Sequence, residues 1–407
     1  MMSTRTRGGP LQGIRVLELT KVWAGPCAGK QLAFLGAEVI RVESLGSLDV
    51  TRSYGVKDIN KAPGFMAVNP QKLSVQIDMK TEEGIALILE LAAKSDILIE
   101  NLRPGAIDRL GLGYERVKAV NPGLIYVSMG MYGNDGPLSY QTGYAPCFAA
   151  LGGVSYLVGQ KSGAPQGMNV RYADSTFGTA AAYAATVALL HRRVTGRGQF
   201  VDVSAVECMS SMVGDALVDY ALNQRIEECD GNRHREAAPH GVYPCKDGAW
   251  LSIAVMGEAQ WQALLRLMTQ PEPPESGALA SEPRFASLAG RKAHEDELDR
   301  CIADWTVTQD ADELACRLQQ AGVPAAKSLS SLDLVADSTL WARGFYRHVD
   351  SAGESRPVVG PSWRMSREAA INTGAPRLGE HNDYILGEVL GLSPQRRAAL
   401  ADSGVTR

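Results

Sequence analysis

The sequence has no C-x-x-C pair and no long run of basic residues. Its seven cysteines are dispersed along 407 residues, a pattern that fits reduced thiols better than disulfides or a structural zinc site. The formal net charge of −4 is small, and no basic run exceeds two or three residues. We therefore expect no nucleic-acid footprint, no bound metal and a reducing compartment.

Long apolar stretches are also missing. Residues 1–10 have no apolar core, so we expect no signal peptide, and no window approaches the length of a membrane span. A cytoplasmic protein is the expectation that follows. Hydrophobic residues make up 45% of the chain, which is enough for a sizeable core, and the length favours two domains.

The usual nucleotide-binding fingerprints are absent as well. No G-x-G-x-x-G follows the first expected strand, and no Walker A lysine motif is present. The first strand leads instead into Thr20–Gly29, where Gly25 permits a tight turn and Pro26 suits a first helical turn. From the residues alone this is a generic strand–loop–helix corner of a kind that accepts phosphates.

The first part of the chain alternates short β-rich runs with helical runs. The expected strands are Ile14–Leu19, Ala37–Glu43, Leu73–Asp78, Asp96–Asn101 and Leu124–Met129, and the expected helices are Cys27–Leu35, Thr81–Lys94 and Ile107–Val120. This rhythm predicts an α/β fold with a parallel sheet flanked by helices. Such sheets bind ligands beyond the carboxyl ends of their strands.

The character of the sequence changes after residue 224. An irregular polar segment is followed by the expected strand Trp250–Val255 and by helical runs, which predicts a smaller α/β domain over residues 225–335. Residues 1–224 are then the first part of a large domain, and residues 336–407 are expected to return to it.

A single carboxylate, Asp174, precedes the alanine-rich run Thr179–Leu190, which is typical of a helix. Asp174 is expected at or just before the helix N-terminus, where free N–H groups and the helix dipole favour an anion. Two roles fit this position. One is an N-cap that contributes about 1 kcal/mol and does no chemistry, and the other is a nucleophile.

Two arginines flank a second expected helix start. Arg103 and Arg109 stand beside Pro104, directly after an expected strand. A guanidinium there is able to bind a phosphate bidentately, and the alternative is an ordinary solvated arginine.

Several motifs together resemble one family, the class III CoA-transferases, which includes formyl-CoA transferase and carnitine CoA-transferase. The motifs run in family order across nearly the whole chain. They are Leu11–Leu19, Ala24–Pro26, Leu35–Glu43, Leu73–Gly84, Asn101–Gly111, Thr195–Gln199, Ala321–Pro324 and Leu378–His381. The resemblance implies a large CoA-binding domain and a small domain in a ring-like chain, with two subunits interlocked as a dimer.

The resemblance also implies a role for Asp174, because the family nucleophile is an aspartate just ahead of a small-residue helix. Asp174 then attacks an acyl-CoA thioester to give an acyl–aspartyl anhydride, and the released thiolate converts it into an aspartyl-CoA thioester. An incoming acid displaces CoA through a second anhydride. CoA is a substrate in this scheme, and no permanently bound cofactor is implied.

Two alternatives remain within the same fold. The α-methylacyl-CoA racemases carry a His-Asp pair where this chain has Thr142–Pro146, which contains neither residue type, so the acid/base partner for proton exchange is missing. The other alternative is a non-catalytic CoA-binding subunit of a hetero-oligomer. Whether the partner subunit in the dimer is identical or only related stays open.

The resemblance also points to residues that contact the acyl group. Trp23 stands where formyl-CoA transferase has a glutamine, which favours an apolar or aromatic wall; the alternative is a core tryptophan. Tyr144 aligns with an active-site tyrosine or is a buried aromatic residue. Ala237–Cys245 takes the place of a glycine-rich lid and retains only Gly241 of it, and His240 there either donates to a substrate carboxylate or is a surface or structural residue.

The CoA phosphates are expected at four basic residues. These are Arg41, Lys72, Arg103 and Arg109, of which Arg109 aligns best with a family CoA-binding arginine. The alternative for Lys72 is a solvated lysine. The expected function is transfer of CoA from an acyl-CoA, with succinyl-CoA as the expected donor, to an organic acid; benzylsuccinate or a similar dicarboxylate is the leading acceptor.

Overall fold

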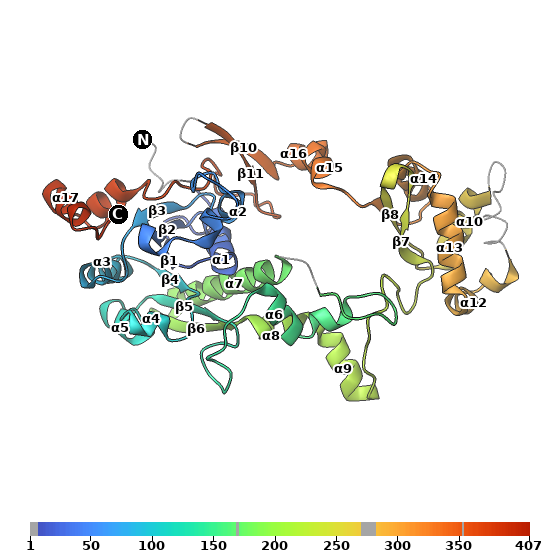
Figure 1. The fold of residues 1–407 in the computed structure, drawn as a ribbon, viewed down its shortest axis with the longest axis horizontal. Helices are drawn as coiled ribbons and strands as arrows, with labels where there is room; N and C mark the ends of the chain where they lie inside the picture. The colour runs from blue at the N-terminus through green and yellow to red at the C-terminus, as the bar shows by residue number, and fades with distance from the viewer. Residues whose placement is uncertain (1–6, 168–170, 270–281, 352–353) are drawn as a thin grey trace. The chain divides into compact units, whose positions relative to one another are not determined.

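The computed structural model describes residues 7–167, 171–269, 282–351 and 354–407. The chain divides into two compact units (Figure 1). The larger comprises the described parts of Met1–Tyr156, Gln166–Glu227 and Thr339–Arg407, and the smaller comprises Leu157–Pro165 with the described parts of Glu228–Ser338. The expected divisions were 1–224, 225–335 and 336–407, so the sequence did not anticipate that 157–165 belong to the smaller unit.

A six-stranded parallel sheet forms the centre of the larger unit. Its order is β3-β2-β1-β4-β5-β6. The strands are β1 (Arg15–Leu19), β2 (Glu38–Glu43), β3 (Leu73–Gln76), β4 (Ile97–Glu100), β5 (Ile125–Gly130) and β6 (Gln199–Ser204). Most residues of the inner strands are buried on both faces, which explains why these strands read as continuous apolar runs rather than as alternating ones.

Helices cover both faces of this sheet. On one face, Leu17 and Leu98 of the sheet share a core with Ile88 of α3 (Glu82–Ala93), Val117 of α5 (Tyr114–Val120) and Ile385 near the C-terminus. Against the other face lie α1 (Ala24–Phe34) and α7 (Tyr172–Thr195), which pack along each other (Figure 1).

Gly178 explains how closely α1 and α7 approach. A Cβ atom at this position would lie 2.5 Å from the carbonyl oxygen of Ala24 and 2.8 Å from Cβ of Cys27. Only a residue without a side chain lets the first turns of the two helices meet in this way. The close approach brings the start of α7, with Asp174, beside the start of α1, with Trp23.

The C-terminal segment, from Thr339 on, belongs to the larger unit. It contains the antiparallel hairpin β10 (Tyr346–Ser351) and β11 (Glu354–Val359), a π-helical segment at Asp383–Val389 and α17 (Pro394–Asp402). Backbone hydrogen bonds from Ala370 to Arg7 and from His381 to Ser74 tie it to the N-terminal part.

Two helical stretches of the larger unit are interrupted. The expected helix 107–120 is split into α4 (Ala106–Arg109) and α5, because Gly111 between them has a φ of 73°. The stretch after β6 consists of α8 (Ala205–Ser210), a 3₁₀ turn at Ser211–Val213 and α9 (Gly214–Asn223). Within the described residues, no helix is both long and apolar enough to cross a membrane.

The smaller unit is an α/β unit of its own. Its antiparallel sheet has the order β7-β8-β9, with β7 (His240–Pro244), β8 (Trp250–Ala254) and β9 (Ala325–Lys327). Its helices include α10 (Glu258–Thr269), α13 (Glu295–Thr306) and α14 (Ala311–Gln320). A separate apolar core that includes Trp261, Ile302 and Leu314 joins these elements.

Candidate active site

The strand order reverses between β1 and β4, and the loops that follow these two strands meet at that point. Open parallel sheets bind ligands at such a reversal, outside the carboxyl ends of the strands. Asn101, after β4, accepts a hydrogen bond from the backbone N–H of Lys21 (2.8 Å) and donates one to its carbonyl oxygen (2.9 Å). The two loops are therefore fixed to each other.

The loop after β1 has a strained conformation. Val22 has a φ of 69°, a region that β-branched residues rarely adopt. The carboxylate of Asp49 accepts a hydrogen bond from the N–H of Val22 at 3.1 Å and thereby holds the turn. The next residue, Trp23, precedes the first residue of α1, so the strained turn determines where the indole lies.

Asp174 lies in the first turn of α7, two residues after the helix start at Tyr172. The N-cap position belongs to Arg171, so the N-cap alternative for Asp174 is wrong. Burial raises the pKa of Asp174 from 3.8 to about 6, and the charge of Arg171 opposes that rise. At neutral pH the group is an anion of raised basicity, which suits a carboxylate nucleophile.

Asp174 faces a pocket of about 370 Å³ within the larger unit. The pocket is lined by Val22, Trp23, Thr51, Tyr54, Pro63, Gly64, Tyr144, Ala145, Pro146, Arg171 and Asp174. Two residues predicted to contact substrate, Trp23 and Tyr144, thus share a pocket with the predicted nucleophile. Their roles toward substrate stay predictions.

The positions of these two aromatic residues exclude the alternative that either one is an ordinary core residue. Trp23 is only partly buried and lines the pocket, so it is not a core tryptophan. Tyr144 precedes α6 (Ala145–Leu151) and is 64% exposed, so it is not an ordinary buried aromatic residue.

Arg171 is the pocket residue that sequence reasoning missed. Its guanidinium lies over the indole of Trp23, and its charge acts on Asp174. The usable signal was spacing, since residues three apart at a helix start face the same side. Ser175 was also missed; its hydroxyl accepts a hydrogen bond from Nε1 of Trp23 at 3.3 Å.

Arg103 and Arg109 lie where a phosphate could reach them. Both are exposed, and both follow β4 at the edge of the sheet where its strands end. The side chain of Arg109 folds back over Gly105, with Nη1 3.0 Å from the position of a Cβ there. Within the described part of the chain, neither arginine forms an ion pair with a carboxylate, so both charges are available to a ligand.

Arg41 and Lys72 require a correction. Arg41 is 1% and Lys72 is 2% exposed, and both pair with Glu18, which is itself fully buried. Nζ of Lys72 also donates to the carbonyl oxygen of Pro26 at 2.7 Å. A phosphate has no access to either group. The sequence could not reveal this, because the carboxylates that enclose them come from separate strands and loops.

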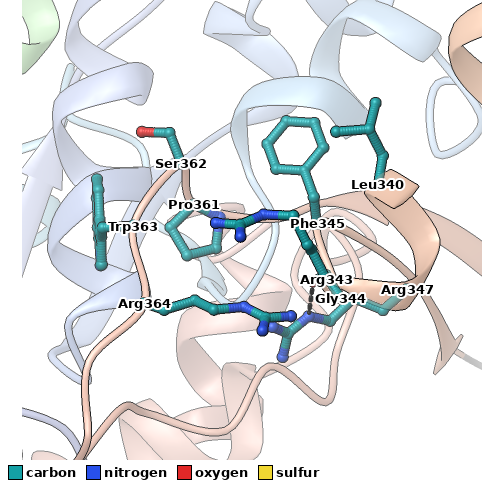
Figure 2. A pocket seen from close by; sticks show the side chains of 9 residues that line it. All are labelled: Leu340, Arg343, Gly344, Phe345, Arg347, Pro361, Ser362, Trp363 and Arg364. Atoms are coloured by element: carbon teal, nitrogen blue, oxygen red, sulfur yellow. Dashed lines mark hydrogen bonds between the residues drawn. The ribbon is translucent and has the colours of Figure 1, made fainter. Parts of the chain in front are cut away.

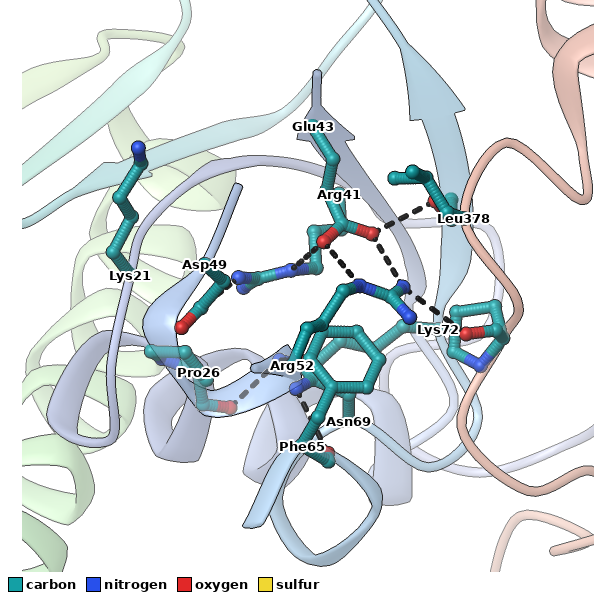
Figure 3. A network of polar contacts seen from close by, with 12 residues as sticks. Lys21, Pro26, Arg41, Glu43, Asp49, Arg52, Phe65, Asn69, Lys72 and Leu378 are labelled. Carbon is teal, nitrogen blue, oxygen red and sulfur yellow. Dashed lines mark hydrogen bonds and ion pairs between the residues drawn. The ribbon is translucent and has the colours of Figure 1, made fainter. Parts of the chain in front are cut away.

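Arg41 instead supports the active-site loop. Its guanidinium pairs with Asp49, the same carboxylate that accepts from the N–H of Val22. Figure 3 shows Arg41 and Arg52 on either side of Glu43, to which both are ion-paired. The buried network therefore stabilises the strained turn before Trp23. Burial lowers the pKa of Lys72 to about 8, and Glu18 opposes that change.

His240 and Gly241 lie elsewhere. Both are on β7 of the smaller unit, where the ring of His240 hydrogen-bonds to the carbonyl of Asn232 and its centroid lies 5.4 Å from that of His234. The pocket that contains Asp174 is lined only by residues of the larger unit. The contact of His240 and Gly241 with substrate stays a prediction. Within the described ranges, no group of three or more His, Cys, Asp or Glu residues is placed to hold a metal ion.

Comparison with known sequences decides the family. The model of CoA-transferase family III matches residues 11–382. The chain belongs to this family. It is thus a class III CoA-transferase, an enzyme whose substrates are CoA thioesters and carboxylic acids, as its motifs predicted.

Individual relatives of this CoA-transferase agree. A succinyl-CoA–D-citramalate CoA-transferase of Chloroflexus aurantiacus is 34% identical over 98% of both chains. A succinate–glutarate CoA-transferase of Agrobacterium fabrum is 32% identical over 96% of this chain and 98% of its own length. The crystal structure of a CAIB/BAIF family protein from Brucella suis superposes with a TM-score of 0.85 at 33% identity, covering 94% of this chain and 100% of that one.

Proposed function

We propose that the protein transfers CoA from succinyl-CoA to a dicarboxylic acid, with Asp174 as the nucleophile. The observation that carries the proposal is the pairing of charges in one pocket. Among the described residues that line it, Asp174 carries the negative charge and Arg171 the positive charge. A dicarboxylate offers one carboxyl group for each: one reacts at Asp174, and the other pairs with Arg171.

The chemistry needs no net hydrolysis. A carboxylate oxygen of Asp174 attacks the thioester carbonyl carbon, and the C–S bond breaks. The products are an acyl–aspartyl anhydride and the free CoA thiolate. The thiolate then attacks the aspartyl carbonyl carbon of the anhydride. This step releases succinate and forms an aspartyl-CoA thioester. The acceptor carboxylate repeats these two exchanges in reverse order, so it leaves as its CoA thioester and Asp174 is restored.

Relatives support the class of acceptor. The names of similar enzymes pair succinyl-CoA with D-citramalate, with glutarate and with L-malate, all of which carry two carboxyl groups. The aromatic lining of this pocket, Trp23, Tyr54 and Tyr144, favours an acceptor with additional apolar surface, such as benzylsuccinate.

CoA itself is proposed to lie along the edge of the sheet with its phosphates at Arg103 and Arg109. Their exposure and lack of a carboxylate partner support this placement. Since Arg41 and Lys72 are enclosed, these two arginines are the predicted phosphate ligands that remain.

Assembly and location complete the proposal. We infer an interlocked dimer, with an identical or related subunit; similar proteins named as alpha and beta subunits of an L-malate CoA-transferase support the alternative of a related subunit. All seven cysteines are free, which supports a reducing compartment such as the cytoplasm.

The test is a panel of acids incubated with succinyl-CoA and the purified protein, with CoA thioesters identified by mass spectrometry. The panel pairs each dicarboxylate with the monocarboxylate of the same length, and benzylsuccinate with 3-phenylpropionate. Thioesters of dicarboxylates should form at least about tenfold faster than those of the matched monocarboxylates. Equal rates for both classes would refute the proposed role of the second carboxyl group.

A further inference from the structure

A second cavity of the larger unit contains three arginines. It has a volume of about 200 Å³ and lies between the residues that follow α16 (Ser338–Ala342) and the loop after β11 (Figure 2). Its lining comprises Leu340, Arg343, Gly344, Phe345, Arg347, Pro361, Ser362, Trp363 and Arg364. None of these residues lines the pocket of Asp174.

The backbone brings two of the guanidiniums together at Gly344. This glycine has a φ of 66°, and a Cβ atom on it would lie 3.6 Å from Nη2 of Arg347 and 3.7 Å from Nη2 of Arg364. Nε of Arg347 donates to the carbonyl oxygen of Gly344 at 2.8 Å, which fixes the direction of that side chain. Figure 2 shows the guanidiniums of Arg347 and Arg364 directed toward each other, with that of Arg343 above them in the view.

No carboxylate balances these charges. The lining contains no Asp or Glu, and within the described residues no ion pair involves Arg343, Arg347 or Arg364. Arg343 and Arg364 are exposed and Arg347 is half-buried, whereas the buried Arg52 and the half-buried Arg233 pair with carboxylates. Three like charges around a small cavity repel one another, and an anion between them converts that repulsion into attraction.

We propose that this cavity binds a phosphate group. A carboxylate has two oxygens, which one guanidinium fork satisfies, whereas a phosphate carries up to two charges and accepts hydrogen bonds from several directions. Three forks that approach from different elements therefore match a phosphate better than a carboxylate. The hydroxyl of Ser362 adds a further donor.

The cavity also has room for what a phosphate is attached to. Trp363 and Phe345 form apolar walls beside the arginines. Such walls accept the organic part of a phosphate ester. Two sources of the same group are thus distinguishable: free phosphate uses the arginines alone, and an aryl or alkyl phosphate uses the walls as well.

The test is a titration of the full-length protein by calorimetry with inorganic phosphate and with phenyl phosphate, at constant ionic strength. Acetate and chloride serve as the reference anions. The variants are Arg347→Gln and Arg364→Gln, and the matched control is Arg367→Gln, an exposed arginine that does not line the cavity. Arg364→Gln changes an exposed side chain, so it keeps the test valid if Arg347→Gln fails to fold.

Either phosphate should bind the wild type, and each of the two variants should weaken that binding by about tenfold or more while the control leaves it unchanged. Tighter binding of phenyl phosphate identifies an organic phosphate as the ligand, and equal binding identifies free phosphate. The proposal is overturned if acetate binds as well as phosphate, or if the variants and the control behave alike. It is also overturned if Arg364→Gln changes the oligomeric state, measured by light scattering, without any phosphate binding in the wild type.

Discussion

The guanidinium carbon of Arg171 lies 4.2 Å from the centroid of the Trp23 indole ring. On its edge, the same indole donates from Nε1 to the hydroxyl of Ser175. Arg171 and Ser175 stand on either side of Asp174 in the first turn of α7. Trp23 is therefore held by the same turn that carries the nucleophile, so acceptor selection and chemistry depend on one structural unit.

Replacing Trp23 should change acceptor preference. Trp23→Gln removes apolar surface that an aromatic acid would bury, at about 25 cal/mol per Å². We expect kcat/KM for benzylsuccinate to fall by a factor that corresponds to a loss of about 1–2 kcal/mol of transition-state stabilisation. The value of kcat/KM for succinate should fall less. Initial rates with both acids measure the difference, with isotopically labelled succinate so that its exchange into succinyl-CoA can be followed, and Trp250→Gln, an exposed tryptophan of the smaller unit, is the control. Equal losses for the two acids would show that Trp23 only packs the loop.

Replacing Arg171 should affect the second carboxyl group. In Arg171→Gln we expect KM for a dicarboxylate acceptor to rise by a factor that corresponds to about 1.5–3 kcal/mol of binding free energy, the value of a charged hydrogen bond. KM for a monocarboxylate should change little. Because Arg171 lowers the pKa of Asp174, the acidic limb of the pH profile should also move to higher pH. Arg193→Gln, an exposed arginine near the far end of the same helix, is the control. A variant that keeps its dicarboxylate preference would remove Arg171 from the substrate site.

The pH dependence of activity follows from the pKa of Asp174. The nucleophile must be ionised, so kcat/KM should decrease about tenfold per pH unit below a pH of about 6. If the acidic limb of the kcat/KM profile lies near pH 4 instead, burial does not raise the pKa of the reacting carboxylate.

The same pKa predicts an effect on stability. Burial favours the protonated form in the folded state, so between the unfolded value of 3.8 and the folded value of about 6 the unfolded chain loses its proton first. The ionised group therefore destabilises the fold above that interval. Asp174→Asn should be more stable than the wild type at pH 7, by at most about 3 kcal/mol, and the difference should vanish near pH 4. Urea unfolding at both pH values measures it, and a constant difference would contradict the linkage.

Lys72 and Arg109 should separate stability from CoA binding. Lys72→Met leaves Glu18 in a buried site with one partner fewer, which should cost about 3–5 kcal/mol of unfolding free energy. Lys94→Met, the replacement of an exposed lysine, should cost little unfolding free energy.

Arg109→Ala should keep the wild-type stability and weaken CoA binding by about 1.5–3 kcal/mol in calorimetry. An unchanged dissociation constant for CoA would show that Arg109 is a solvated surface residue that does not contact the CoA phosphates.

The sequence predicted the sheet well because its signal is local. The five expected strands of the first part each overlap an observed strand, since buried parallel strands are short apolar runs bounded by turns. Asp174 was predicted from its place at a helix start and from the family resemblance, which also pointed to Trp23 and Tyr144, and the three residues line one pocket. Burial was not predictable in the same way: Arg41 and Lys72 are enclosed by Glu18 and Asp49, whose positions depend on how separate segments pack. Arg171 was missed because its role depends on the indole that lies beneath it.

The central claim is that Asp174 carries the acyl group and then CoA. The direct measurement is peptide mass spectrometry after incubation with succinyl-CoA and trapping with hydroxylamine or borohydride. The wild type should be modified at Asp174 alone, and Asp174→Ala should show no modification and lose turnover by several orders of magnitude while it still binds CoA. Full activity in Asp174→Ala, or modification of another residue, would contradict the account.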